Sequence, residues 1–417
     1  MVASLIRIHP LRTSGKAFAS FREMIRISRS LAAVCAFLGL PSISAAQPIK
    51  TLDGRLLTTA SIEASVEGLM RANTVNGLAV ALIRNGRVVY LRSFGIRNAK
   101  GEPLTPDTVM YAASLTKATF AYMVMQLVDE KKLDLDRSIA DYLPKPLPDY
   151  PEYKDLSNDQ RWRKLTFRIL LDHTTGFANF RWFEPDRKLR FHRDPGIRFD
   201  YSGEGLQLAQ FVLETGLGLD LTKEMQRRVF NRLNMSRTSM IWREDLVDDD
   251  ADVFLANGRS EKHNRRTKPG AAGSMDTTAR DWSRFLAAVV NGKFLSARGK
   301  AEMIRRQIPI DSVKEFPTLS QATTDTYQSI HLGYGIGWGV FDTPYGAAFF
   351  KEGHDDGTGN YALCIQPRKA CILLLSNSDK AEGIYKPLVE ELMGNVGLPW
   401  RWENYIPYDM PATTPGK

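Results

Sequence analysis

Side chains that bind metals are scarce in this chain. Its 417 residues include only three cysteines and six histidines. The histidines form no His-Glu-x-x-His motif, which would place two imidazoles on one face of a helix. The cysteines lack the paired spacing of a structural zinc site. We therefore expect no metal and no other cofactor, so that any catalysis would depend on ordinary side chains.

Long apolar runs are also missing, which excludes an ordinary membrane span of about 20 apolar residues. The apolar run 31–40 is too short, but six basic residues precede it and Ser44-Ala45-Ala46 follows it. This order is typical of a secretory signal peptide. We expect residues 1–46 to be that signal and the mature protein to begin at Gln47, in the periplasm or outside the cell. Two alternatives are a start at Met24 and a lipid anchor on Cys35.

Little net charge remains once this segment is set aside. The whole chain carries +9, and residues 1–46 contribute +5 of it, which leaves +4 for residues 47–417. The basic cluster 262–268 lies among glycine, serine and asparagine and is typical of a solvated loop. We therefore expect no nucleic-acid partner. The composition does not indicate an oligomeric state.

The order of expected elements indicates one domain over residues 47–417. No repeat, low-complexity segment or flexible linker interrupts it. Asn85-Gly86 between two apolar runs predicts a hairpin, and strand patterns return after about residue 331. The pattern favours an α/β lobe from about 50–120 and 331–405, with a mainly helical lobe over about 121–330. Within the latter, 141–164 is rich in proline and tyrosine and predicts a surface excursion.

Ser114 and Lys117 form a Ser-x-x-Lys motif where an extended segment is expected to meet a helix. Residues three apart share a helix face, so the Lys117 amine can lie beside the Ser114 hydroxyl. Burial and the helix N-terminus both disfavour an ammonium there, which would make Lys117 a base for a nucleophilic serine. By itself the motif is also compatible with a helix-capping serine and a solvated lysine.

Two further motifs lie far along the chain. Tyr201-Ser202-Gly203 precedes an expected helix, and Lys351-Glu352-Gly353 ends an expected strand. A tyrosine with an ordinary pKa of about 10 acts as a base at neutral pH only where cations surround it. We expect Lys117 and Lys351 to be those cations.

In this order the three motifs resemble those of the class C β-lactamase and penicillin-binding group of serine hydrolases. Leu170–Phe177 and Gly335–Gly339 are similar to further segments of that group, and the resemblance covers nearly the whole mature chain. It implies a β-lactamase-like α/β (α+β) sandwich, in which helices flank an antiparallel sheet beside a mainly helical lobe.

The resemblance also implies a role for each site residue. Ser114 would form the acyl-enzyme, Lys117 would keep the proton network poised, and Tyr201 would act as base and then as acid. Lys351 would orient Tyr201 and any substrate carboxylate. The backbone N–H groups of Ser114 and His354 would bind the oxyanion. The His354 ring either assists deacylation, titrating near neutral pH, or packs outside the site.

Three departures from the group's pattern bear on the substrate. Gly203 stands where the group has asparagine, Glu352 where it has threonine or serine, and His354-Asp355-Asp356 replaces a glycine-rich stretch. These changes remove polar contacts that a penicillin would use. Aromatic residues at 177, 180, 182 and 183 are candidates for the wall of an acyl pocket, and equally for lobe-interface core.

We therefore expect an exported serine hydrolase that resembles β-lactamase-like carboxylesterases and cleaves short-chain esters, with weak β-lactam hydrolysis. The alternatives are a β-lactamase, a D-amino-acid peptidase or carboxypeptidase, and a penicillin-binding-like receptor without turnover. Its partners would be small ester, lactam or amide substrates. Cys364 and Cys371 bracket an expected hairpin loop and would face each other if Ile365 pairs with Ala370. A disulfide and two buried thiols both fit this pattern.

Overall fold

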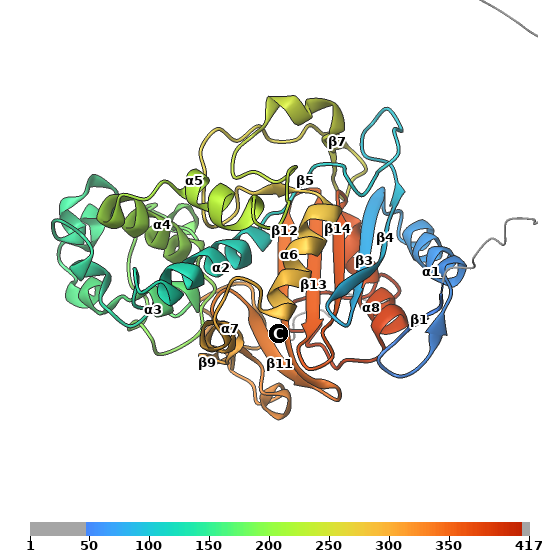
Figure 1. Ribbon diagram of the computed structural model, residues 1–417. Helices are drawn as coiled ribbons and strands as arrows, with labels where there is room; N and C mark the ends of the chain where they lie inside the picture. The colour runs from blue at the N-terminus through green and yellow to red at the C-terminus, as the bar shows by residue number, and fades with distance from the viewer. Residues whose placement is uncertain (1–46, 411–417) are drawn as a thin grey trace, which may run out of the picture. The chain divides into compact units, whose positions relative to one another are not determined.

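The computed structural model describes residues 47–410, which belong to one compact unit (Figure 1). The predicted signal peptide, with the alternatives at Met24 and Cys35, lies outside the described residues. Eight antiparallel strands form the main sheet in the order β4-β3-β14-β13-β12-β11-β10-β9. Their bounds are β3 Gly77–Arg84, β4 Arg87–Gly95, β9 Ile308–Pro309, β10 Gly333–Tyr334, β11 Gly339–Thr343, β12 Gly346–Asp355, β13 Thr358–Ile365 and β14 Ala370–Ser376.

Alternating side chains of the central strands enter two different cores. Leu78, Val80 and Leu82 of β3 face one core, while Ala79, Ala81 and Ile83 face the other. Such two-sided burial is expected of strands covered on both faces. Helices α1 Thr59–Ala72 and α8 Tyr385–Met393 cover the first face, and α6 Ala279–Asn291 packs on β3, β4 and β14 from the second. The fold is therefore the antiparallel α+β sandwich that the resemblance implied.

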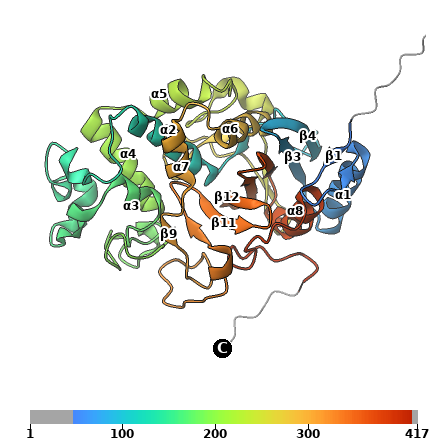
Figure 2. The ribbon, with the colours of Figure 1, turned by 60° about the horizontal axis from the view of Figure 1, so that its bottom comes forward.

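A second group of helices extends from the sheet (Figures 1 and 2). It contains α3 Phe167–Leu171, α4 Gly203–Leu217 and α5 Leu221–Met225, whereas α7 Ala297–Ile304 packs on α2 Leu115–Asp129. Helix α6 falls in the range 121–330 that was predicted as helical lobe, but it packs on the sheet because its apolar face matches that surface. The segment 141–164 forms short 3₁₀ turns and is only partly a surface excursion, since Tyr153 and Trp162 are buried.

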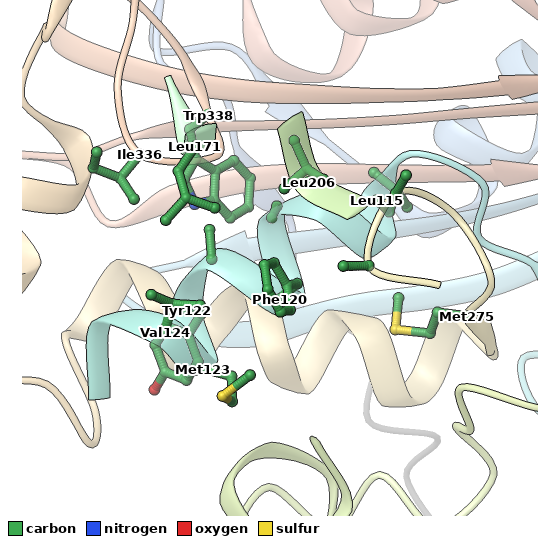
Figure 3. Close-up of a cluster of buried hydrophobic side chains, with 14 of the residues drawn as sticks. Leu115, Phe120, Tyr122, Met123, Val124, Leu171, Leu206, Met275, Ile336 and Trp338 are labelled. Carbon is green, nitrogen blue, oxygen red and sulfur yellow. The ribbon is translucent and has the colours of Figure 1, made fainter. Parts of the chain in front are cut away.

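Helix α2 lies between these parts and is buried on almost every side. Figure 3 shows its side chains, including Phe120 and Tyr122, among Leu171, Leu206 and Trp338 from other elements. An apolar helix surrounded in this way is held rigidly. The residues at its N-terminus are therefore fixed relative to both the sheet and the helical part.

Short pairings complete the fold. They are β1 Ile49–Lys50 with β2 Leu56–Leu57, β5 Met110–Tyr111 with β8 Asp276–Thr277, and β6 Val253–Phe254 with β7 Ser260–Glu261. In the predicted hairpin, Asn85 and Gly86 both have positive φ, as a type I′ turn requires. Cys364 pairs with Cys371 across β13 and β14, and the two sulfurs form a disulfide. Within residues 47–410, no helix is both long and apolar enough to cross a membrane.

Candidate active site

Ser114 lies at the junction of β5 and α2. The preceding residue, Ala113, has a positive φ of 46°, which is unusual for a side-chain-bearing residue and is typical of functional turns. Two hydrogen bonds fix this turn: the Ala112 N–H donates to Met275, and the Thr116 hydroxyl donates to Ala113. The hydroxyl of Ser114 is thereby held at the start of a buried helix.

Lys117 follows one turn later and is buried. Its Nζ donates to the Ser114 Oγ over 2.9 Å and to the backbone carbonyl of Ala272 over 2.6 Å. Burial, followed by the charge of nearby Lys351, lowers the pKa of Lys117 to about 7. A neutral amine beside the serine hydroxyl can accept its proton. The predicted nucleophile and base are thus in hydrogen-bond contact.

Tyr201 completes the group from the loop before α4. Its ring centre lies 4.9 Å from the Nζ of Lys117 and 4.9 Å from the Nζ of Lys351, and the latter amine donates to its hydroxyl over 3.3 Å. His173 stacks on the ring with centroids 4.3 Å apart and bonds to the Ser202 backbone. The structure thus places His173 as a support for the tyrosine loop.

The pKa of Tyr201 moves in the direction opposite to the predicted one. Burial, followed by the charges of Glu352 and Glu315, raises this pKa well above its usual value, although the hydrogen bond to Ser114 lowers it. Lys351 does not act as a free cation here, because its Nζ also contacts Glu352 Oε1. Tyr201 therefore keeps its proton at neutral pH. Lys117 is better placed to accept a proton, and Tyr201 is better placed to donate one.

The end of β12 passes directly against the nucleophile segment. A Cβ on Gly353 would lie 2.7 Å from the Ala112 carbonyl oxygen, so this approach requires glycine. It brings the backbone at His354 close to the start of α2. The His354 ring hydrogen-bonds Glu382 over 2.7 Å and is half-exposed. That hydrogen bond raises the pKa of His354 to about 9, so the ring does not titrate near neutral pH.

Several neighbours of the site have no motif in the sequence. Glu315 and Glu403 are buried near Lys351, and each keeps a carboxyl oxygen without a partner. They lie on irregular segments, 36 and 52 residues from Lys351, and no residue spacing could have identified them. Among residues 47–410, no group of three His, Cys, Asp or Glu side chains is arranged to hold a metal ion.

Phe180 fills the place where the resembled group carries an asparagine side chain. A Cβ on Gly203 would lie 2.3 Å from two atoms of the Phe180 ring, which itself stacks on Trp182. Nearby is a hollow of about 430 Å³. Its lining residues are Ala178, Asn179, Phe183, Glu184, His192, Phe316, Pro317, Thr318 and Leu319. The Phe316 ring lies 5.4 Å from that of Tyr201, which places the hollow beside the candidate site.

The fold and the three motifs define a serine hydrolase of the β-lactamase and penicillin-binding type. The chain belongs to the Beta-lactamase family, whose model matches residues 62–390. It is 22% identical over 355 residues to penicillin-binding protein 4 of Amycolatopsis lactamdurans, covering 79% of this chain and 88% of that one.

Two further similarities cover different shares of the chain. D-Aminopeptidase of Gluconobacter oxydans is 24% identical over 187 residues, which are 43% of this chain and only 35% of that enzyme. The structure of D-alanine carboxypeptidase AmpC from Burkholderia cenocepacia superposes with a TM-score of 0.62 at 17% identity, covering 79% of this chain and 98% of that one. At this identity the structural similarity supports the shared fold.

Proposed function

We propose that the protein is an exported carboxylesterase that cleaves short-chain esters through an acyl-enzyme on Ser114. The observation that carries the proposal is the contact of 2.9 Å between Lys117 Nζ and Ser114 Oγ, in a setting that lowers the lysine pKa to about 7. A nucleophile in contact with a neutral base is the arrangement that covalent hydrolysis requires.

The geometry supports the following sequence of steps. Neutral Lys117 accepts the Ser114 proton while the oxygen attacks the ester carbonyl carbon. The backbone N–H groups of Ser114 and His354 would stabilise the resulting oxyanion. Tyr201 donates its phenolic proton to the departing alkoxide and regains one from Lys117. Water then attacks the acyl-enzyme and gives a proton to this Lys117–Tyr201 pair. The pair returns a proton to the Ser114 oxygen as the carboxylic acid is released.

Two features of the site favour esters over β-lactams. Phe180 occupies the space at Gly203 where an amide side chain would otherwise contact a lactam substituent. The hollow beside Tyr201 has apolar walls from Phe183, Phe316 and Leu319, which suit a small acyl or alcohol group.

A second candidate is hydrolysis of D-amino-acid peptides. The similar proteins named D-aminopeptidase and D-alanine carboxypeptidase favour it. The same acylation step would serve an amide, with Tyr201 donating to a leaving amine. The third possibility, a receptor that is acylated without turnover, has less support because all four of Ser114, Lys117, Tyr201 and Lys351 are present in contact.

The first experiment is an activity panel on purified residues 47–417. It compares p-nitrophenyl acetate and butyrate, a chromogenic cephalosporin and a D-alanyl p-nitroanilide, with Ser114→Ala as the matched inactive variant. We expect ester turnover far above lactam and amide turnover, and its loss in Ser114→Ala with an unchanged melting temperature. Dominant D-alanyl or lactam turnover, a stable acyl adduct without product release, or full activity in Ser114→Ala would contradict the carboxylesterase proposal.

A further inference from the structure

The third motif contains a buried ion pair made by adjacent residues of β12. Lys351 is fully buried and Glu352 nearly so, and Lys351 Nζ contacts Glu352 Oε1. The same Nζ donates to the Tyr201 hydroxyl over 3.3 Å. The ammonium of Lys351 is therefore already held by a carboxylate and a phenol. The resemblance assigns this lysine to a substrate carboxylate, but here an internal carboxylate occupies it.

Two more buried carboxyl groups surround the pair. Glu352 pairs across the sheet with Tyr361, whose hydroxyl donates to Glu403 over 3.1 Å. The backbone N–H of Glu315 donates to Trp402, next to Glu403. Glu315, Glu352 and Glu403 each retain one buried carboxyl oxygen without a partner. Burial raises the pKa of both Glu315 and Glu403 well above the usual value, which favours their neutral forms and leaves Glu352 as the carboxylate paired with Lys351.

This balance of charge disfavours an incoming anion. A substrate carboxylate would have to displace Glu352 from Lys351 or lie near it without a cation of its own. Either arrangement brings like charges together where little water screens them, which disfavours binding. A neutral ester meets no such penalty, because its reacting carbonyl requires only the backbone N–H groups and the Ser114–Lys117 pair.

The geometry points to Glu352 as a specificity-determining residue that occupies Lys351 and restricts the site to substrates without a carboxylate beside the scissile bond. The inference rests on the proposed function and names its substrate class as neutral acyl compounds. Selection then acts by repulsion of the wrong substrate, in addition to attraction of the right one.

The test uses a chromogenic cephalosporin and its methyl ester, which differ only in the carboxylate. For the wild-type protein we expect kcat/KM to be at least about tenfold higher for the methyl ester. In Glu352→Gln the amide keeps a hydrogen-bond acceptor for Lys351 but removes the charge. We expect this variant to raise kcat/KM for the acid about tenfold relative to kcat/KM for the methyl ester, whatever its effect on the rate common to both substrates.

Asp356→Asn is the matched control, since it removes an exposed negative charge from the same hairpin without reaching Lys351. Its ratio of ester to acid should equal that of the wild type. A wild-type protein that prefers the acid, or a ratio unchanged in Glu352→Gln, overturns the inference. If Glu352→Gln does not fold, Glu352→Thr takes its place. The inference is then judged from the ratio of kcat/KM for the methyl ester to kcat/KM for the acid in this variant and in the wild type. Only activity that Ser114→Ala abolishes is counted. A failure of the proposed acyl-enzyme mechanism is thereby distinguished from a failure of the inference about Glu352.

Discussion

Lys117 and Tyr201 lie beside the same hydroxyl and have pKa values shifted in opposite directions. Burial and Lys351 lower the pKa of Lys117, whereas burial, Glu352 and Glu315 raise that of Tyr201. Two neighbouring groups whose environments separate their pKa values are suited to act as base and acid. At the scale of single residues, the structure therefore favours Lys117 as the acceptor of the Ser114 proton.

This assignment predicts the pH dependence of ester hydrolysis. Lys117 is active as the neutral amine, so kcat/KM for p-nitrophenyl acetate should fall as pH decreases through about 7, where the amine gains a proton. Below that value the loss should approach about tenfold per pH unit. Stopped-time absorbance assays between pH 5 and 9 measure this limb.

Tyr201→Phe is the comparison for this profile. We expect its rate to be lower by about 10² to 10⁴, as for loss of a general acid, with the limb near pH 7 preserved. If the fall in kcat/KM near pH 7 disappears in Tyr201→Phe, the titrating group is the tyrosine. Tyr201 would then be the base that accepts the Ser114 proton.

At the scale of elements, the start of α4 and the loop carrying Phe180 fit together only because residue 203 is glycine. In Gly203→Ala the new Cβ would meet the Phe180 ring at 2.3 Å. We expect a loss of about 1–3 kcal/mol in the free energy of unfolding, measured in urea, as for overpacking elsewhere. Adding Phe180→Ala should remove most of that penalty, because the two sites are in contact.

Gly68→Ala in α1 provides the control for this cycle, since no atom lies within 4 Å of its Cβ position. We expect it to stabilise the protein by about 0.5–1 kcal/mol, the usual gain of alanine over glycine in a helix. If Gly203→Ala lowers the free energy of unfolding equally with and without the Phe180 ring, the ring does not oppose a side chain at residue 203. That result would contradict the close packing of Phe180 on Gly203.

The elements that the sequence predicted best are those with strong local signals. The Asn85-Gly86 hairpin and the register that joins Cys364 to Cys371 both agree with the structure. The features that were missed depend on contacts between distant segments. Phe180 fills the space at Gly203, the Ala272 carbonyl binds Lys117, and Glu315 approaches Lys351 from an irregular loop. No local pattern encodes such contacts.

At the scale of the whole molecule, the signal-peptide hypothesis and the disulfide both bear on whether the protein is exported. Disulfides persist in oxidising compartments, which supports export. Expression of the full chain in a bacterium with an active secretion system should release a protein whose mass and N-terminal sequence begin at Gln47. A species that keeps residues 1–46, or one that carries lipid at Cys35, would contradict cleavage at Ala46.

The sheet order also limits when the protein can fold during synthesis. Strand β3 lies between β4 and β14, and Leu78 pairs with Ser376, about 300 residues further along the chain. A ribosome that adds 5–20 residues per second needs about 15 to 60 seconds to make the chain between these partners. During that time the β3–β4 hairpin has an open apolar edge and the nucleophile helix has no sheet to pack on. Transport of the unfolded chain, followed by folding once β14 is available, therefore matches the order in which this architecture can close.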